Sequence, residues 1–300
     1  MKYLITIIGP TAIGKTALAI KVAQHFQCEI ISCDSRQFYR EMYIGTAVPS
    51  PEELAAAPHH FIHNRSIHDN YTVGDFEKEA IAKLDELFLK GDFAVMVGGS
   101  GLYVDAVLKG FDQFPEVDAE VRQNLQVKYE EHGITFLQTE LQERDPEYYA
   151  TVDINNPQRV LRALEICIHA GKPYSSFLGI AKPIRNFTPI IIGLDADREI
   201  LYERINRRVD IMMEQGLEDE VRNLIVYKRL NALQTVGYRE LISYFEGEFS
   251  LEQAVAEIKK NTRRFAKRQL TWFRRTEGTM WFDYEVDASE IIEKVRDKVQ

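Results

Sequence analysis

Short apolar runs alternate with amphipathic stretches over the first third of the chain. Three of the runs have the length and the β-branched content of buried strands: Tyr3–Ile8, Glu29–Cys33 and Phe93–Val97. Between them, residues 17–23 and 75–90 have the apolar spacing of helices. Strands that alternate with helices form a parallel sheet, so this pattern predicts an α/β fold with its functional residues beyond the carboxyl ends of the strands.

A fourth apolar run, Pro189–Leu194, comes only after a long and different segment. Residues 111–188 are charged and helix-rich with several prolines, and they are far longer than a normal crossover connection. We therefore expect a core domain made of residues 1–110 and 189–300, and a helical insertion domain made of residues 111–188. After the fourth run, the pattern predicts mostly helices up to the end of the chain.

The turn after the first strand carries the most specific motif. Residues 9–16 fit the phosphate-loop pattern G-x-x-x-x-G-K-[ST], and they stand between a strand and a helix, as the motif requires. The residues are Gly9, Pro10, Thr11, Ala12, Ile13, Gly14, Lys15 and Thr16. In such a loop, backbone N–H groups hold phosphate oxygens, the lysine reaches a terminal phosphate and the threonine hydroxyl can ligate Mg²⁺. The motif predicts a P-loop NTPase-like core that binds a di- or triphosphate, with Thr16 as the metal ligand.

The acidic residue nearest to this motif stands in an unusual place. A phosphate-loop ATPase normally has an acidic residue at the end of a further apolar strand, where it holds Mg²⁺. Here the third run ends in Gly98-Gly99-Ser100, and Asp34 follows the second run instead. Asp34 could ligate a metal, accept a proton from a nucleophile, or only cap a turn.

A run of basic residues stands near the C-terminus of a chain that is acidic as a whole. The formal net charge is −9, yet residues 259–275 contain eight basic residues and no acidic one. On a helix, one stripe would hold Lys260, Arg264, Lys267, Arg268 and Arg275. Solvated faces usually mix the two signs of charge, so a face of one sign favours contact with nucleic-acid phosphates.

Two other segments place arginines on expected helices. Gln158, Arg159 and Arg162 would lie near one helix face, with donors suited to bases or phosphates. Arg204 and Arg208 are four residues apart after the fourth strand, a spacing that suits a second clamp on a pyrophosphate. Ion pairs with neighbouring residues on a solvated helix would explain the same arginines.

Composition indicates a protein of a reducing compartment. The three cysteines lack metal-ligand spacing, and no apolar run approaches the length of a membrane span. The apolar start leads directly into the phosphate loop, so we do not interpret it as a signal peptide. We expect a cytoplasmic monomer with no membrane partner.

Together, these segments resemble the tRNA dimethylallyltransferases, also called tRNA isopentenyltransferases. The resemblance rests on residues 9–16, Asp-Ser-Arg-Gln at 34–37, Ile-Gly-Thr-Ala at 44–47, Pro-His-His at 58–60, Gly-Gly-Ser-Gly-Leu-Tyr at 98–103, residues 157–165, Val-Gly-Tyr at 236–238 and residues 266–274. They span almost the whole chain in the order of the family. The resemblance implies transfer of the dimethylallyl group of dimethylallyl diphosphate to N6 of adenosine 37 in the tRNA anticodon stem-loop, with Mg²⁺ as cofactor.

The resemblance also implies residue roles. Asp34 would be the general base, and Ser100 would assist at the reacting centre. Lys15 and the phosphate loop would hold the diphosphate, with Arg208 as the first choice of partner and Arg204 as the second. The tRNA contacts that it implies are Asp34, Ser35, Arg36, Gln37, Ser100, Arg122, Gln158, Arg159, Val160, Leu161 and Arg162. To these, the charge pattern adds Lys260, Arg264, Lys267 and Arg268.

Three positions depart from the usual residues of the family. Val48 stands in place of Lys, Ser100 in place of Thr and His63 in place of Asp. Ser100 keeps the hydroxyl, whereas Val48 removes a basic group. Two alternatives remain: a small-molecule kinase of the shikimate-kinase type, which would need neither the insertion nor the basic helix, and a nucleotide-gated RNA-binding module, which would tolerate loss of Asp34.

Overall fold

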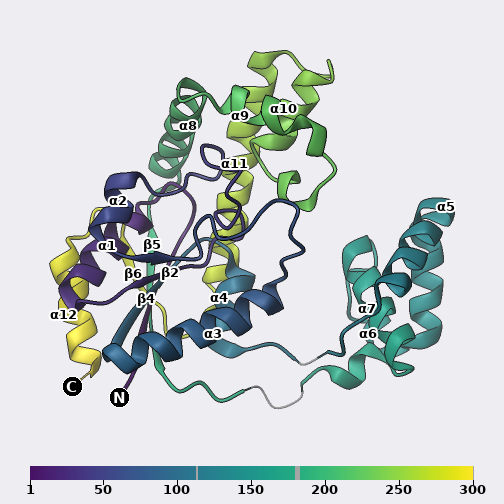
Figure 1. The fold of residues 1–300 in the computed structure, drawn as a ribbon, viewed down its shortest axis with the longest axis horizontal. Coiled ribbons are helices and arrows are strands. Elements are labelled where there is room, and N and C mark those ends of the chain that lie inside the picture. Colours follow the sequence, from purple (N-terminus) through teal and green to yellow (C-terminus); the bar gives the residue numbers. More distant parts are fainter. Residues whose placement is uncertain (113, 180–182, 300) are drawn as a thin grey trace. The chain divides into compact units, whose positions relative to one another are not determined.

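A computed structural model describes residues 1–112, 114–179 and 183–299 of the chain. They form two compact units, Met1–Leu108 with Arg185–Gln300, and Lys109–Ile184 (Figure 1). The segment expected as an insertion, residues 111–188, overlaps the second unit almost throughout. No helix among the described residues is long and apolar enough to cross a membrane.

The first unit is built on a six-stranded parallel sheet, which confirms the expected α/β class. In spatial order the strands are β3 (His59–His60), β2 (Ile30–Ser32), β4 (Phe93–Val97), β1 (Tyr3–Ile8), β5 (Thr188–Asp195) and β6 (Met280–Asp283). The four apolar runs correspond to β1, β2, β4 and β5. The expectation of mostly helices after β5 missed β6, which pairs with β5 at the edge of the sheet.

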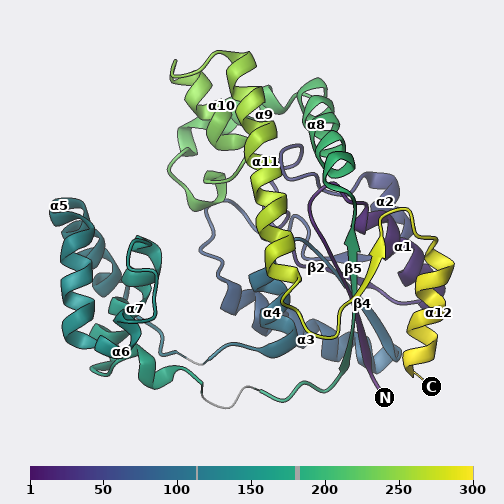
Figure 2. The same cartoon turned by 180° about the vertical axis from the view of Figure 1, so that it is seen from behind.

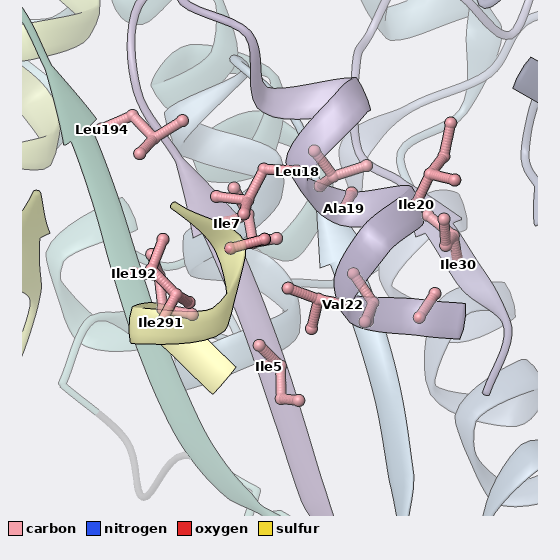
Figure 3. Packing of buried hydrophobic residues seen from close by; sticks show 14 of the residues in the cluster. Ile5, Ile7, Leu18, Ala19, Ile20, Val22, Ile30, Ile192, Leu194 and Ile291 are labelled. Atoms are coloured by element: carbon pink, nitrogen blue, oxygen red, sulfur yellow. The ribbon is translucent and has the colours of Figure 1, made fainter. Parts of the chain in front are cut away.

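Helices cover both faces of this sheet (Figure 1). The helices of the first unit are α1 (Lys15–Phe26), α2 (Pro51–Ala56), α3 (Val73–Lys90), α4 (Gly101–Lys109), α8 (Arg198–Glu214), α9 (Leu217–Leu224), α10 (Tyr238–Phe245), α11 (Leu251–Phe273) and α12 (Ala288–Val299). Of these, α9 and α10 lie beyond the end of the sheet and pack against the first half of α11 (Figure 1). Successive residues of β1 point to opposite faces, so both faces are apolar. On one face, Ile5 shares a cluster with Val22 of α1 and Ile291 of α12 (Figure 3). On the other, Leu4 shares a cluster with Phe76 of α3.

Helix α11 contributes to every core cluster of the first unit that the described residues form. Its first half packs Ala254 and Ile258 into a cluster with α9 and α10. Further along, Ala266 belongs to the cluster under α1, and Phe273 belongs to the cluster under α3. Figure 2 shows this helix running from α10 to the sheet. Its position is therefore fixed along its whole length.

The second unit is a small helical body. Its helices are α5 (Ala119–Arg144), α6 (Pro146–Tyr149) and α7 (Pro157–Ala170), followed by a 3₁₀ turn over Tyr174–Phe177. Gly133 interrupts α5 with a φ of 72°. Leucines of α5 and α7 form the core, and the buried Asp145 caps α6 through the N–H of Tyr148 and accepts hydrogen bonds from Ser175.

The close approach of β2 and β4 predicts the effect of a methyl group at Gly98. A Cβ there would lie 2.5 Å from Sγ and 2.6 Å from the carbonyl oxygen of Cys33. Gly98→Ala should therefore lower the free energy of unfolding by about 1–3 kcal/mol, as overpacking does. Gly91→Ala introduces the same methyl group into open space and should change it by less than about 0.5 kcal/mol. Urea unfolding measures both, and equal effects would contradict this account.

Candidate functional site

A cavity of about 610 Å³ opens beyond the carboxyl ends of β1, β2 and β4. The phosphate loop, Asp34 and Gln37 line it together with residues of two helices, Arg204, Arg207 and Arg208 of α8 and Phe265 and Gln269 of α11. The structure thus brings to one place several residues that the sequence had suggested separately. Ser100 is one residue beyond the lining residue Gly99.

The geometry of the phosphate loop depends on its two glycines. Gly9 has a φ of 151°, and a Cβ on it would lie 2.7 Å from the carbonyl oxygen of Leu194 in β5. Gly14 precedes α1 with a φ of 107° and provides no side-chain cap for the helix. The N–H groups of the first turn of α1 are therefore available to an anion.

Two cations lie at this loop. The Nζ of Lys15 donates to the carbonyl oxygen of Pro10 at 2.7 Å, and Nη1 of Arg208 donates to Oγ1 of Thr11 at 3.4 Å. Burial, with a smaller effect of Arg208, lowers the pKa of Lys15 to about 8. Burial also lowers the pKa of Arg208, and the nearby Asp34 carboxylate opposes both shifts. The site therefore holds desolvated positive charge that Asp34 and, at Arg208, also Glu53 balance only in part.

Arg204, the second choice for this role, lies in a more open position. It is exposed, its Nε donates to the carbonyl oxygen of Ala12 at 2.9 Å, and its guanidinium stands over the ring of Tyr284. Both arginines line the cavity, and Arg208 is the more deeply placed of the two.

Asp34 and Ser100 belong to loops that are hydrogen-bonded to each other. The Oδ1 of Asp34 accepts the N–H of Arg36 at 3.0 Å, and within the described ranges its Oδ2 accepts no hydrogen bond. The hydroxyl of Ser100 accepts the N–H of Ser35 at 3.0 Å and donates to its Oγ at 3.1 Å. The carboxylate is thus oriented by one oxygen while the other is available for a proton.

A carboxylate that sequence reasoning missed holds another wall of the cavity. Glu220 of α9 accepts four hydrogen bonds, at 3.0, 2.7, 3.0 and 2.6 Å, from the N–H groups of Tyr43, Ile44 and Gly45 and from the hydroxyl of Tyr238. On its other side, this wall is held by the amide of Gln37, which donates to the carbonyl oxygens of Thr46 and Ala47. The available signal was the Val-Gly-Tyr motif at 236–238, whose tyrosine is this partner.

Two of the three departures from the family, Val48 and His63, fall in different places. Val48 lines the cavity, so the usual lysine is replaced by an apolar surface there. His63 lies outside the residues that line the cavity, with its ring centroid 5.6 Å from that of Tyr43. The departure at position 48 therefore bears on the site more directly.

The basic stripe on α11 is less one-sided than the sequence suggested. Lys260 donates to Glu257 at 2.6 Å, and Arg264 donates to Oδ1 of Asn261 at 3.3 Å. Lys267 and Arg268 are exposed. The expected helical stripe included Arg275, which was wrong because α11 ends at Phe273.

In the second unit, two of the suggested RNA contacts share one acidic partner. Arg122 of α5 and Arg162 of α7 donate to the nearly buried Glu165 at 3.0 and 3.3 Å. Gln158 and Arg159 are exposed at the start of α7. The unit thus presents two arginines that an acidic side chain holds, one on α5 and one on α7, and two exposed polar side chains at the start of α7.

The suggestion that Val160 and Leu161 contact tRNA needs correction. Their side chains are 0% and 6% exposed and belong to the core of the second unit. They pack α7 against α5, so contact with an RNA by these side chains is excluded by burial. By packing α7 against α5, they hold the helix that carries Arg159 and Arg162.

The parallel sheet, the phosphate loop and the buried cation pair define a P-loop-type protein that binds phosphate groups. The family model described as IPP transferase matches residues 37–276, and the chain belongs to this family. It is 65% identical to a tRNA dimethylallyltransferase of Flavobacterium johnsoniae, over 97% of this chain and 96% of the relative.

Solved structures agree with the family. A tRNA isopentenylpyrophosphate transferase of Bacillus halodurans is 37% identical, with a TM-score of 0.73, over 100% of this chain and 96% of that one. A eukaryotic dimethylallyltransferase acting on tRNA has a TM-score of 0.81 at 26% identity, over 100% of this chain and 78% of that one.

The lowered pKa of Lys15 predicts how anion binding depends on pH. The free protein loses the proton of Lys15 at about pH 8, whereas a bound diphosphate would keep the ammonium charged to higher pH. The affinity for dimethylallyl diphosphate should therefore change little between pH 7 and about 8 and fall above that, approaching tenfold per pH unit. Calorimetric titration from pH 7 to 9.5 measures this fall. In Lys15→Arg, which does not titrate in this range, the inflection should disappear; its persistence would assign it to another group.

Proposed function

We propose that this chain is a tRNA dimethylallyltransferase that transfers the dimethylallyl group from dimethylallyl diphosphate to N6 of adenosine 37, beside the anticodon. The observation that supports this most strongly is the pair of desolvated cations, Lys15 and Arg208, in one cavity with Asp34. An allylic diphosphate needs cations at its leaving group and a base at its acceptor, and this cavity offers both. The family relationship favours this activity over the kinase and the non-catalytic RNA-binding module.

In the proposed reaction, the adenine amine attacks the allylic C1 carbon. The N–C bond forms, the C–O bond to diphosphate breaks with its electron pair leaving on the diphosphate, and Asp34 accepts the amine proton. The amine is a poor nucleophile because its lone pair is delocalised into the ring, so a base contributes ~10²–10⁴-fold. Lys15, Arg208 and the loop N–H groups stabilise the charge that develops on the diphosphate.

A divalent metal fits this site only together with the diphosphate. No group of three His, Cys, Asp or Glu side chains that could hold a metal occurs among the described residues. Thr16 lines the cavity, and hydroxyl and phosphate oxygens are the hard ligands that Mg²⁺ prefers. We propose Thr16 as the protein ligand of Mg²⁺, which would add positive charge at the leaving group.

The tRNA would be held by each unit through its own basic residues. We propose contacts from Ser35, Arg36 and Gln37 beside the base, from Arg122, Gln158, Arg159 and Arg162 of the second unit, and from Lys260, Arg264, Lys267 and Arg268 of α11. The target adenine must leave its stack, at a cost of a few kcal/mol that phosphate contacts can offset. We further propose that the enzyme acts in the cytoplasm as a monomer.

The direct test is incubation of the protein with unmodified tRNA and dimethylallyl diphosphate, followed by nucleoside analysis. Formation of N6-(dimethylallyl)adenosine and of diphosphate in equal amounts is expected. ATP hydrolysis without prenyl transfer would support the kinase alternative and overturn the proposal.

Asp34→Asn tests the role of the base. The amide keeps the shape and the hydrogen bond from Arg36 but is not basic. Turnover should fall by ~10²-fold or more, while tRNA affinity changes little. Single-turnover transfer and filter binding measure the two quantities. Near-normal turnover in this variant would leave Asp34 as a residue that only orients the loop.

The exposed face of α11 predicts a salt effect. The variant has Ala in place of four basic residues, Lys260, Arg264, Lys267 and Arg268. The plot of log tRNA affinity against log salt concentration should become less steep by about two to three, since each phosphate contact adds about 0.7 to the slope. The KM for dimethylallyl diphosphate should stay the same. Changing Lys78, Lys83, Lys294 and Lys298 removes the same charge from α3 and α12 and serves as the control. Equal slopes for the two variants would show that the α11 face is only solvated.

A further inference from the structure

The side chain of Gln269 joins two loops of the site from a third element. It lies in α11, is 6% exposed and lines the cavity. Its Oε1 accepts the N–H of Thr11 at 2.9 Å, and its Nε2 donates to the carbonyl oxygen of Gly99 at 2.8 Å. Thr11 belongs to the phosphate loop, and Gly99 directly precedes Ser100. One nearly buried amide therefore connects the diphosphate side of the cavity to the Ser100 side.

The two partners of this side chain require an amide. The N–H of Thr11 needs an acceptor and the carbonyl of Gly99 needs a donor, and a glutamine side chain has one of each at its end. A glutamate would keep the first bond but would direct a carboxylate oxygen at the carbonyl of Gly99. A Cβ at Gly99 would lie 2.3 Å from Nε2 of Gln269, so the amide occupies space that only glycine leaves open.

The same helix holds the Ser100 loop at a second point. A Cβ on Gly101 would lie 2.4 Å from Cδ1 of Trp272, so the indole packs directly against this backbone. Its Nε1 donates to Asp105 of α4 at 2.8 Å. Gln269 and Trp272 are three residues apart and share a helix face. Ser100 thus stands between two glycines that are each in contact with α11.

We propose that Gln269 is a positioning residue, which sets the distance between the diphosphate in the phosphate loop and the hydroxyl of Ser100 beside Asp34. This inference rests on the proposed function. The two loops follow different strands, β1 and β4, and the amide is the hydrogen-bonded link between them through α11. Placement of reacting groups to within ~1 Å is worth ~10²-fold in rate, so loss of this link should slow transfer without removing any reacting group.

The test compares Gln269→Met, which has a similar volume and neither hydrogen bond, with Gln269→Glu, which keeps only the acceptor. Gln24→Met is the matched control, because Gln24 is exposed on α1 and its amide also donates to a backbone carbonyl, that of Ala56. All proteins are assayed well below their unfolding temperatures. We expect kcat to fall at least about tenfold in both Gln269 variants. In Gln269→Met, the dissociation constant for inorganic pyrophosphate should also rise by calorimetry, and Gln24→Met should match the wild type in both measurements.

A double-mutant cycle with Ser100→Ala separates positioning from a general structural role. If Gln269 acts through Ser100, the loss of kcat in the double variant will be smaller than the product of the two single losses. The inference would be overturned if the two single losses of kcat multiply in the double variant. It would also be overturned if both kcat and the pyrophosphate affinity of Gln269→Met lie within twofold of the wild type. Pyrophosphate binding does not require transfer. A wild type without transferase activity would refute the proposed function, and a weaker pyrophosphate affinity in Gln269→Met would then still support the link to the phosphate loop.

Discussion

The structure of the site depends on keeping two cations, Lys15 and Arg208, out of water, with Asp34 near both of them and Glu53 near Arg208. Burial disfavours the charged forms of both Lys15 and Arg208, and Asp34 compensates only in part. Their hydrogen-bond partners in the loop, the carbonyl of Pro10 and the hydroxyl of Thr11, are neutral. Such an arrangement lowers the stability of the fold, and a bound polyanion would remove the deficit of negative charge. Binding of an anion should therefore stabilise the folded protein.

The strand order makes this arrangement possible. The neighbours β2, β4 and β1 are parallel, so the loops that follow them emerge at the same edge of the sheet. Each loop brings one group: Lys15 after β1, Asp34 after β2 and Ser100 after β4. Neighbouring strands are about 4.8 Å apart, so the loops that follow them lie close together. This spacing alone does not determine how the side chains of one loop are placed relative to those of the next. Hydrogen bonds between the loops determine this placement. Ser100 is hydrogen-bonded to Ser35, and the amide of Gln269 joins the phosphate loop to Gly99.

The sequence predicted the parts of the protein whose signal is local. The four apolar runs and the phosphate-loop motif need only neighbouring residues to be recognised. The strands β3 and β6 were missed because a two-residue strand and a short edge strand have little apolar periodicity of their own. The roles of Glu220 and Gln269 were missed for another reason: the backbone groups that they bind are 170 or more residues away in the chain. Val160 and Leu161 illustrate the opposite error, in which residues were assigned a contact that they do not offer. A motif that spans a helix also includes the residues of its buried face.

Helix α11 combines an exposed basic face with a buried face that holds the site. Lys267 and Arg268 are exposed, and the next residue, Gln269, is nearly buried between two loops. A phosphate bound on the outer face would thus act on the same backbone that carries the inner amide. However, α11 packs into three core clusters, and close-packed cores resist small displacements of a helix seated in them. We therefore expect RNA bound on this face to gain affinity from a rigid support and to leave the loops where they are.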